Sequence, residues 1–268
     1  MPLDPAWRET ALSVTGSFEN PGDPFSGITG DFDGQGLSLG VLQWNIGQGS
    51  LQPLVRAAGQ PAVMAGMPVF GGEFWSAVTS TIPQGLAIVR NWQTKNTVRK
   101  DVSRELAAFC GGPDMRAQQI AAANHVADIA YEAADNWAQQ RGEDEPTKKE
   151  FCWFFDLVTQ NGSLKGLRLL DVRGFLDQWG DDNADDAVCD WLITRTKSQF
   201  GFQDCVENAR EWRNKVSDAD LDLFILSYLR ALKSVFVSQG VVLNRKGTIA
   251  LTKGWVNRSH LDLSAQLG

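Results

Sequence analysis

Histidine is almost absent from this 268-residue chain, and long apolar runs are missing. The only histidines are His125 and His260, and no two cysteines have CxxC spacing, so the usual ligand sets for zinc are not present. No run of about 18 apolar residues could span a membrane. The start, MPLDPAWRET, lacks the basic and apolar regions of a signal peptide. We therefore expect no metal, no cofactor and no membrane span, and any export must use another route or a longer parent protein.

Positive charge is also in deficit. Lysine and arginine number 25 against 32 aspartates and glutamates, which gives a net charge of -7, and the basic residues look scattered along the sequence. A nucleic acid is therefore not an expected partner, because no basic stripe faces a phosphate backbone. The cysteines fit either two disulfides, in any of three pairings, or four buried thiols. They are Cys110, Cys152, Cys189 and Cys205.

The local signals that are present predict a mostly α protein with a small β-hairpin or sheet near the N-terminus. Asp4 is placed to cap a helix that starts at Pro5 and runs to Phe18 or Glu19. Residues 28–46, ITGDFDGQGLSLGVLQWNI, contain glycine turns between β-forming residues and carry the only clear β signal. At 43% hydrophobic residues the chain is long enough for one large domain or two packed lobes. We predict a single α+β domain over residues 1–268, with a small β-containing lobe at about 20–60.

The remaining chain reads as helices in one continuous body. A short helix ends at Gly59, one or two helices precede the breaker at 111–113, and a helix over 114–141 is long enough to invite a kink. Its predicted apolar side carries Ile120, Ile129, Ala133 and Trp137. A capping box of Thr147 and Glu150 opens a helix that ends at Asn161 and Gly162. Ser217 is expected to cap a further apolar helix that continues through Phe236 to Gly240.

Two carboxyl groups near the N-terminus occupy contrasting environments. Glu19 falls at a helix C-terminus, where the helix dipole disfavours negative charge and favours the protonated acid. Phe18 and Phe25 would add desolvation in the same direction. Asp33 falls in the glycine turn DFDGQG, where we expect it to be solvated and ionised. A neutral acid beside an ionised carboxylate is the arrangement that general acid–base catalysis needs.

The motif SFEN followed by DGQGLSLG resembles that of family 46 chitosanases and the lysozyme superfamily to which they belong. The resemblance implies a lysozyme-like fold with two lobes flanking a cleft. It further implies that Glu19 is the general acid, that Asp33 is the general base and that Ser38 positions the attacking water. Inversion at the anomeric carbon would then need carboxyl groups roughly 6.5 to 9.5 Å apart, whereas about 5 Å would indicate a covalent route.

Departures from the chitosanase pattern bear on the substrate. The arginine of the chitosanase turn is Gln35 here, and the continuation LGVLQWNIGQGSLQPL looks like lysozyme-like domains of bacterial wall-degrading effectors, including those delivered by type VI secretion. FFDLVTQNG resembles a helix end that lines the cleft in this superfamily. The substrate-binding residues that these resemblances imply, together with the aromatic face of Trp44, are Gln35, Gln43, Trp44, Asn45, Asp156, Gln160 and Asn161.

These features predict a hydrolase of the peptidoglycan glycan backbone, a muramidase, that reaches the periplasm or cell wall of a target cell. An immunity protein or a secretion-apparatus component is the expected protein partner. Two alternatives stay open, a chitosanase and a non-catalytic glycan-binding module. An acidic protein attracts polycationic chitosan and weakly repels anionic wall polymers over a Debye length of about 8 Å, but the motif departures outweigh this long-range effect.

Other candidate motifs fit structural roles better. The acidic run at 181–190 starts like a calcium loop but lacks the glycine at position six and the glutamate at position twelve, so we interpret it as a solvated connection or helix start. His125 and Asp128 are one helical turn apart, yet no motif ties a nucleophile to them. Gly34 and Gly36 form a lone GxG without a βαβ pattern, which makes a nucleotide loop improbable.

Overall fold

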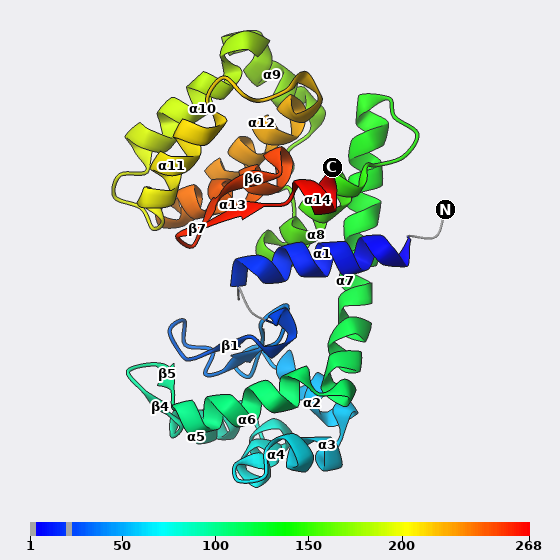
Figure 1. Ribbon diagram of the computed structural model, residues 1–268, viewed down its shortest axis with the longest axis vertical. Coiled ribbons are helices and arrows are strands. Elements are labelled where there is room, and N and C mark those ends of the chain that lie inside the picture. The colour runs from blue at the N-terminus through cyan, green and yellow to red at the C-terminus, as the bar shows by residue number, and fades with distance from the viewer. Residues whose placement is uncertain (1–3, 20–22) are drawn as a thin grey trace. The chain divides into compact units, whose positions relative to one another are not determined.

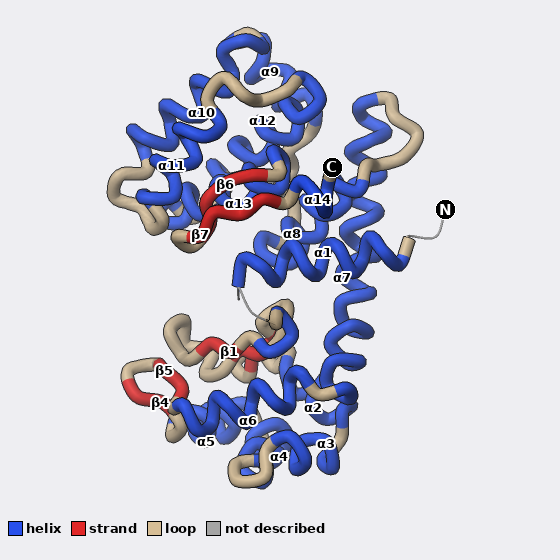
Figure 2. Tube along the Cα trace, in the orientation of Figure 1, coloured by secondary structure: helices blue, strands red, loops and turns tan. Residues whose placement is uncertain are grey.

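The computed structural model describes residues 4–19 and 23–268, and over these residues the protein is mostly helical with three small antiparallel sheets (Figure 1, Figure 2). The predicted class, mostly α with a small sheet near the N-terminus, is confirmed. The chain divides into two compact units. We call Thr15–His125 the central unit, and Met1–Val14 together with Val126–Gly268 the terminal unit. The β segment predicted at 20–60 belongs to the central unit, which continues to His125.

In the central unit a three-stranded sheet precedes a group of helices. β2 (Ser38–Leu39) lies between β1 (Ile28–Thr29) and β3 (Trp44–Asn45) and pairs antiparallel with both. The other elements before α7 are η1 (Pro24–Ser26), α2 (Leu51–Ala58), α3 (Gln60–Gly66), α4 (Gly71–Thr79), α5 (Ile82–Arg90), β4 (Gln93–Thr94), β5 (Thr97–Val98) and α6 (Lys100–Gly111). The short helix predicted to end at Gly59 is α2, with Gly59 as its C-cap at a positive φ of 91°.

The core of the central unit combines aliphatic side chains with three aromatic rings, and one buried amide is also enclosed. Phe74 lies 5.9 Å from Phe109 and 6.2 Å from Trp92, centroid to centroid. Gln119 on α7 (Pro113–Arg141) is fully buried; its Oε1 accepts from Val41 N at 3.0 Å, and its Nε2 donates to two main-chain oxygens. Because an unpaired buried amide is costly, these bonds make Gln119 a specific tie between α7 and the sheet segment.

The terminal unit consists mainly of helices. Those after α7 are α8 (Lys148–Asn161), α9 (Leu169–Trp179), α10 (Asp181–Arg195), α11 (Phe202–Trp212), α12 (Asp218–Leu232), η2 (Phe236–Ser238), α13 (Gln239–Leu251) and α14 (Ser264–Leu267). A hairpin of β6 (Lys253–Val256) and β7 (Ser259–Asp262) follows α13 and packs against it. α1 (Pro5–Glu19) begins in this unit, where Trp7 lies 6.0 Å from Phe151 between ring centroids.

Helix starts predicted from capping chemistry are confirmed. Asp4 Oδ1 accepts from Ala6 N at 2.9 Å, and α1 starts at Pro5 and ends at Glu19. Thr147 and Glu150 form the reciprocal capping box that opens α8. Ser217 does stand at the N-cap of α12, but its hydroxyl donates to Asp220 Oδ2 at 2.9 Å instead of accepting a main-chain N–H.

Two expectations about helix extent and facing are wrong. The helix after Ser217 ends at Leu232, and Val235 and Phe236 are mostly exposed, so the apolar run does not mark one continuous core helix. In α7, which has no break, Ile120 and Ile129 are exposed by about 40%. The buried side of α7 is instead formed largely by alanines, whose small side chains allow close packing: Met115, Gln119, Ala123, Ala127, Ala130, Ala134, Trp137 and Ala138.

The sequence also missed two hairpins. In each, a two-residue turn has positive φ at non-glycine residues, Lys95 and Asn96 in one, Asn257 and Arg258 in the other. Such turns normally contain glycine, so the sequence pattern did not indicate these hairpins.

Of the two alternatives for the cysteines, disulfides or buried thiols, the structure has the second, since all four are free buried thiols. Within the described residues, no helix combines the length and apolar character needed to cross a membrane.

Candidate functional site

The DFDGQG motif forms a loop, residues 30–36, that connects β1 to β2, and we call it the acidic loop. Its first carboxylate is held on both oxygens: Asp31 Oδ1 accepts from Gly36 N and Oδ2 accepts from Arg90 Nε, each at 2.6 Å. Arg90 Nη2 also donates to Gly34 O at 3.2 Å. The sequence nominated Asp33 and overlooked Asp31, although both stand in the same motif.

Gln93, on β4, also holds the acidic loop through two side-chain hydrogen bonds to its backbone. Its Oε1 accepts from Asp31 N at 2.8 Å, and its Nε2 donates to Gly36 O at 2.6 Å. Gly36 has φ 82°, and a Cβ there would lie 2.4 Å from Leu86 Cδ2, so both backbone conformation and space demand glycine. The loop is therefore fixed at its two ends by α5 and β4.

Asp31 is ionised over a wide pH range. The hydrogen bond from Arg90 lowers the pKa of Asp31 below its ordinary value of 3.8; partial burial opposes this, and the Gly36 N–H supports it. A carboxylate with a lowered pKa and both oxygens occupied is a poor general base. Its contacts suit it to shaping the loop.

The middle of the acidic loop is exposed. Asp33 Oδ1 accepts from Gln35 N at 3.1 Å, and among the described residues no donor reaches its Oδ2. Phe32, beside it, has 72% of its surface exposed. No role is predicted for Phe32 from the sequence, yet an exposed aromatic ring on a fixed loop is a flat apolar surface of the kind that a sugar ring contacts.

Of the other predicted residues of the central unit, Ser38 and Asn45 are buried and Gln43 is of intermediate exposure. Ser38 is buried in the middle strand, opposite Thr29 and Asn45. The Asn45 side chain is also buried and bonds to Gln48, where its Oδ1 accepts from the main-chain N at 2.8 Å. Gln43, at φ 55°, donates from Nε2 to Gly40 O at 2.9 Å.

Two further predicted residues of this unit are partly exposed. Trp44 is half-buried against the hydrophobic core, and Gln35 is likewise of intermediate exposure. The Asn45 and Gln43 amides are engaged in local turns, so among the predicted sugar contacts here Trp44 and Gln35 are the partly exposed side chains that are not used in such a turn.

The remaining predicted contacts lie on α8, in the terminal unit. Asp156 is fully buried; its Oδ1 accepts from Arg245 Nε at 2.7 Å and its Oδ2 accepts from Lys246 Nζ. Burial pushes the pKa of Asp156 up, but its two cationic partners outweigh burial and lower it. Burial lowers the pKa of Lys246 to about 8, against the attraction of Asp156. This carboxylate is thus occupied by an internal ion-pair cluster.

The end of α8 is only partly available. Gln160 is exposed. The main-chain oxygen of Asn161 accepts from Arg230 Nη2 at 3.1 Å, and the buried Asn161 Oδ1 has no hydrogen-bond partner within the described residues. Of the three α8 residues, Gln160 is the one with an exposed side chain.

Glu19 is the last residue of α1 and belongs to the central unit, as Asp33 does. Its side chain and the following Asn20 lie outside the described part of the structure. Phe18 and Phe25 are buried, and their predicted desolvation of the Glu19 carboxyl group stays a prediction. The separation of the Glu19 and Asp33 carboxyl groups therefore stays a prediction.

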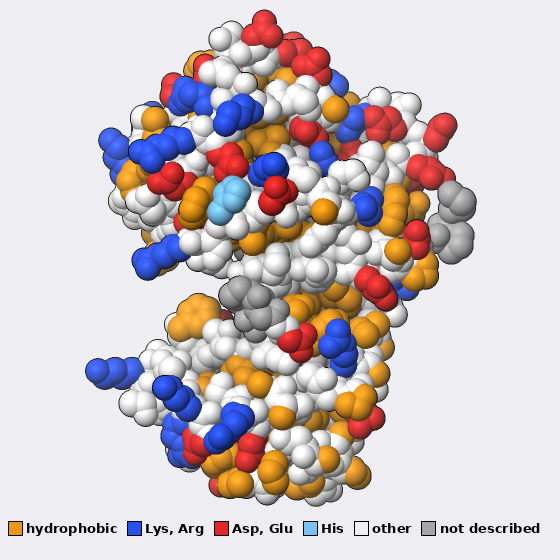
Figure 3. Space-filling view, viewed as in Figure 1, with side chains coloured by type: hydrophobic (Ala, Val, Ile, Leu, Met, Phe, Trp, Pro, Cys, Tyr) orange, Lys and Arg blue, Asp and Glu red, His pale blue; other side chains and the backbone are white. Residues whose placement is uncertain are grey.

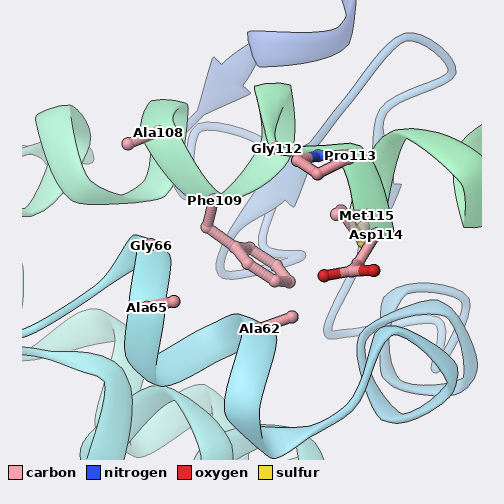
Figure 4. A pocket seen from close by; sticks show the side chains of 9 residues that line it. All are labelled: Ala62, Ala65, Gly66, Ala108, Phe109, Gly112, Pro113, Asp114 and Met115. Carbon is pink, nitrogen blue, oxygen red and sulfur yellow. The ribbon is translucent and has the colours of Figure 1, made fainter.

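The other candidate charged groups and one further pocket are not part of the acidic loop. Asp181 and Asp182 open α10, so the acidic run is a helix start, and Asp128 accepts from Arg8 at 3.0 Å while His125 is exposed. Among the described residues no three His, Cys, Asp or Glu side chains converge as a metal site would require. A 300 Å³ pocket, between α3 and the junction of α6 and α7, is lined mainly by apolar residues, with the Asp114 carboxylate beside the Phe109 ring (Figure 4).

Comparison with known proteins gives no relative. No protein-family model, no curated protein and no solved structure matches this chain. Assignment of a function therefore depends on the residues of the acidic loop and their neighbours.

Proposed function

We propose that the protein hydrolyses the glycan strands of peptidoglycan, with Glu19 as general acid and Asp33 as general base. The observation that carries the proposal is the acidic loop, in which an exposed aspartate is presented by a backbone fixed through a second, ionised aspartate. A catalytic carboxylate must be held in one place, because misplacement by about 1 Å can cost about 100-fold in rate. An unconstrained surface aspartate would not need Asp31, Arg90 and Gln93 around it.

Asp33 fits the base because one oxygen is oriented and the other is open. Its Oδ1 accepts the Gln35 N–H, which restrains the orientation of the side chain. In the proposed mechanism Oδ2 accepts a proton from water as that water attacks the anomeric carbon. Ser38, in the adjoining strand, would orient the same water.

Glu19 fits the acid because α1 ends at that residue. The carbonyl end of a helix favours the protonated form of a nearby carboxyl group, which is the form that can donate a proton to the departing sugar oxygen. Phe32 would stack on a sugar ring next to the bond that is cut, and Trp44 would support a neighbouring sugar. The lysozyme-like arrangement of two lobes flanking a cleft, with Gln160 from α8 as a second-lobe contact, belongs to this proposal.

The test is product analysis with matched variants. Purified protein is incubated with peptidoglycan, and fragments are identified by mass spectrometry together with new reducing ends. Glu19→Gln and Asp33→Asn should each abolish product without loss of folding. Glu132→Gln and Asp177→Asn, which change exposed carboxylates elsewhere in the same way, should retain full activity.

The outcomes separate the proposal from its two rivals. No new reducing ends from a folded wild-type protein would contradict peptidoglycan hydrolysis. Release of glucosamine oligomers from chitosan, with peptidoglycan untouched, would identify a chitosanase. Glycan binding that persists unchanged in the Glu19 and Asp33 variants, without turnover in any of them, would identify a binding module.

A further inference from the structure

Charge is distributed unevenly between the two units. The central unit has seven basic and eight acidic residues, so the terminal unit carries -6 of the net charge of -7. Within residues 90–104 the only acidic residue is Asp101. Five of the seven basic residues fall there: Arg90, Lys95, Arg99, Lys100 and Arg104. The expectation of scattered basic residues is therefore wrong for this unit. Figure 3 shows Lys and Arg side chains gathered at the end of the central unit that carries β4 and β5.

The basic segment contains the β4–β5 hairpin, which is in direct contact with the acidic loop. A Cβ on Gly30 would lie 2.0 Å from Asn96 O and 2.7 Å from Gln93 Oε1, so the turn of the hairpin sits against the start of the loop. Gln93 also bonds to Asp31 N and Gly36 O, as described above. The hairpin and the acidic loop are thus one packed structure.

Three basic side chains of this segment have no ion-pair partner among the described residues. Arg90 is paired with Asp31, and Arg99 is paired with Asp101 at 3.1 Å and lies over the Phe70 ring. Exposed side chains without an ion-pair partner among the described residues remain at three positions: Lys95, Lys100 and Arg104. The turn at Lys95, where φ is 50°, places one of these charges at the hairpin tip.

We infer that the β4–β5 hairpin and its basic flanks bind carboxylates of the glycan, so that the substrate is an acid-bearing aminosugar polymer and polycationic chitosan is disfavoured. This inference rests on the proposed function, because it concerns the polymer that reaches Asp33. Charges within a Debye length of about 8 Å of a bound chain are the least screened, and Lys95 lies on the turn that packs against the start of the acidic loop. These cations should therefore attract an anionic polymer toward the acidic loop.

The inference is tested with three polymers that share a backbone type and differ in charge: anionic carboxymethyl chitin, neutral glycol chitin and cationic glycol chitosan. The variant Lys95→Glu/Lys100→Glu, called the hairpin variant, reverses the charge at the hairpin tip and the charge at the start of α6. The control Lys197→Glu/Lys215→Glu makes the same change of net charge at exposed positions of the terminal unit. At about 20 mM salt, kcat/KM of the hairpin variant on the anionic polymer should fall about tenfold, and at about 0.5 M salt the difference should vanish.

The expected pattern is selective. Activity of the hairpin variant should stay within about twofold on glycol chitin and should rise on glycol chitosan, while the control variant should follow the wild type. An equal loss on all three polymers, or an equal loss in the control, would overturn the inference. Should the hairpin variant fail to fold, Lys95→Gln/Lys100→Gln removes the charges without reversing them and should show about half the effect on a logarithmic scale.

Failure of the proposed function gives a different result from failure of this inference. A wild-type protein that cleaves none of the polymers contradicts the hydrolase, and the hairpin is then tested by binding alone. In affinity electrophoresis through a gel that contains carboxymethyl chitin, the hairpin variant should be retarded less than the control variant. Equal retardation of the two would refute carboxylate binding by the hairpin.

Discussion

Removing the Asp31 carboxylate tests whether the acidic loop is fixed in the way its contacts indicate. The change is Asp31→Asn, which keeps the shape of the side chain and removes its charge. Two hydrogen bonds of 2.6 Å reach this carboxylate, from Gly36 N and from Arg90 Nε. A hydrogen bond to a charged group contributes about 1.5–3 kcal/mol, but the Arg90 side chain is 48% exposed, so solvent limits its share to about 1 kcal/mol or less.

We therefore expect Asp31→Asn to lower the free energy of unfolding by about 1–3 kcal/mol, and Arg90→Gln by about 0.5–1 kcal/mol. Urea unfolding at pH 7 measures both, and the double variant gives a coupling energy of about 0.5–1 kcal/mol. Asp33→Asn is the control within the same loop. Its side chain accepts a single main-chain bond, which asparagine can also accept, so its stability should change by less than about 0.5 kcal/mol.

The coupling should also depend on pH. Arg90 lowers the pKa of Asp31 below 3.8, so the stabilisation is complete above that value and is lost as the pH falls through the folded-state pKa. At pH 2 the coupling should be smaller than at pH 7. A coupling below about 0.2 kcal/mol at pH 7, or one that is unchanged by acid, would refute the role given to Asp31.

Three further predictions follow from burial and exposure. Asp156→Asn leaves its two buried cationic partners without a carboxylate and should cost about 3–5 kcal/mol in urea unfolding, against less than about 0.5 kcal/mol for exposed Asp177→Asn; a loss below about 1 kcal/mol would contradict this. Burial raises the pKa of Cys110 and Cys152 to about 12. Because the folded state then keeps protons that the unfolded state releases, stability should fall as pH rises above 9, and less steeply when both residues are alanine. Phe32→Ala should raise KM on glycan about three- to tenfold with unchanged stability, whereas Phe32→Trp should retain activity and report oligosaccharide binding by fluorescence; an unchanged KM in the alanine variant would remove the ring from the site.

Local capping chemistry made several helix boundaries predictable. Asp4 with Pro5 and Thr147 with Glu150 act within one turn of backbone, so their effect is readable in sequence order. Gly240 was predicted to end a helix, but it lies in the first turn of α13. A Cβ there would lie 2.7 Å from Cys205 Sγ, so glycine allows a close approach by a segment that is distant in sequence.

The candidate site was predictable only in part. The glycine turn marked the acidic loop correctly, because Gly36 needs both its positive φ and its lack of a side chain. The partners that hold the loop, Arg90 and Gln93, are more than fifty residues away in sequence, and no local pattern links them to Asp31. Exposure of Phe32 likewise depends on the whole fold, since most aromatic residues in such a chain are buried.

The division of the chain has a consequence for biosynthesis. The central unit is one uninterrupted segment, whereas the terminal unit joins the first fourteen residues to those after His125. As the chain leaves the ribosome, the acidic loop and its supports have all their partners once residue 125 has emerged. The contact of Trp7 with Phe151, its 6.0 Å neighbour, can form only when residue 151 has also emerged, and it closes a loop of more than a hundred residues that spans the whole central unit.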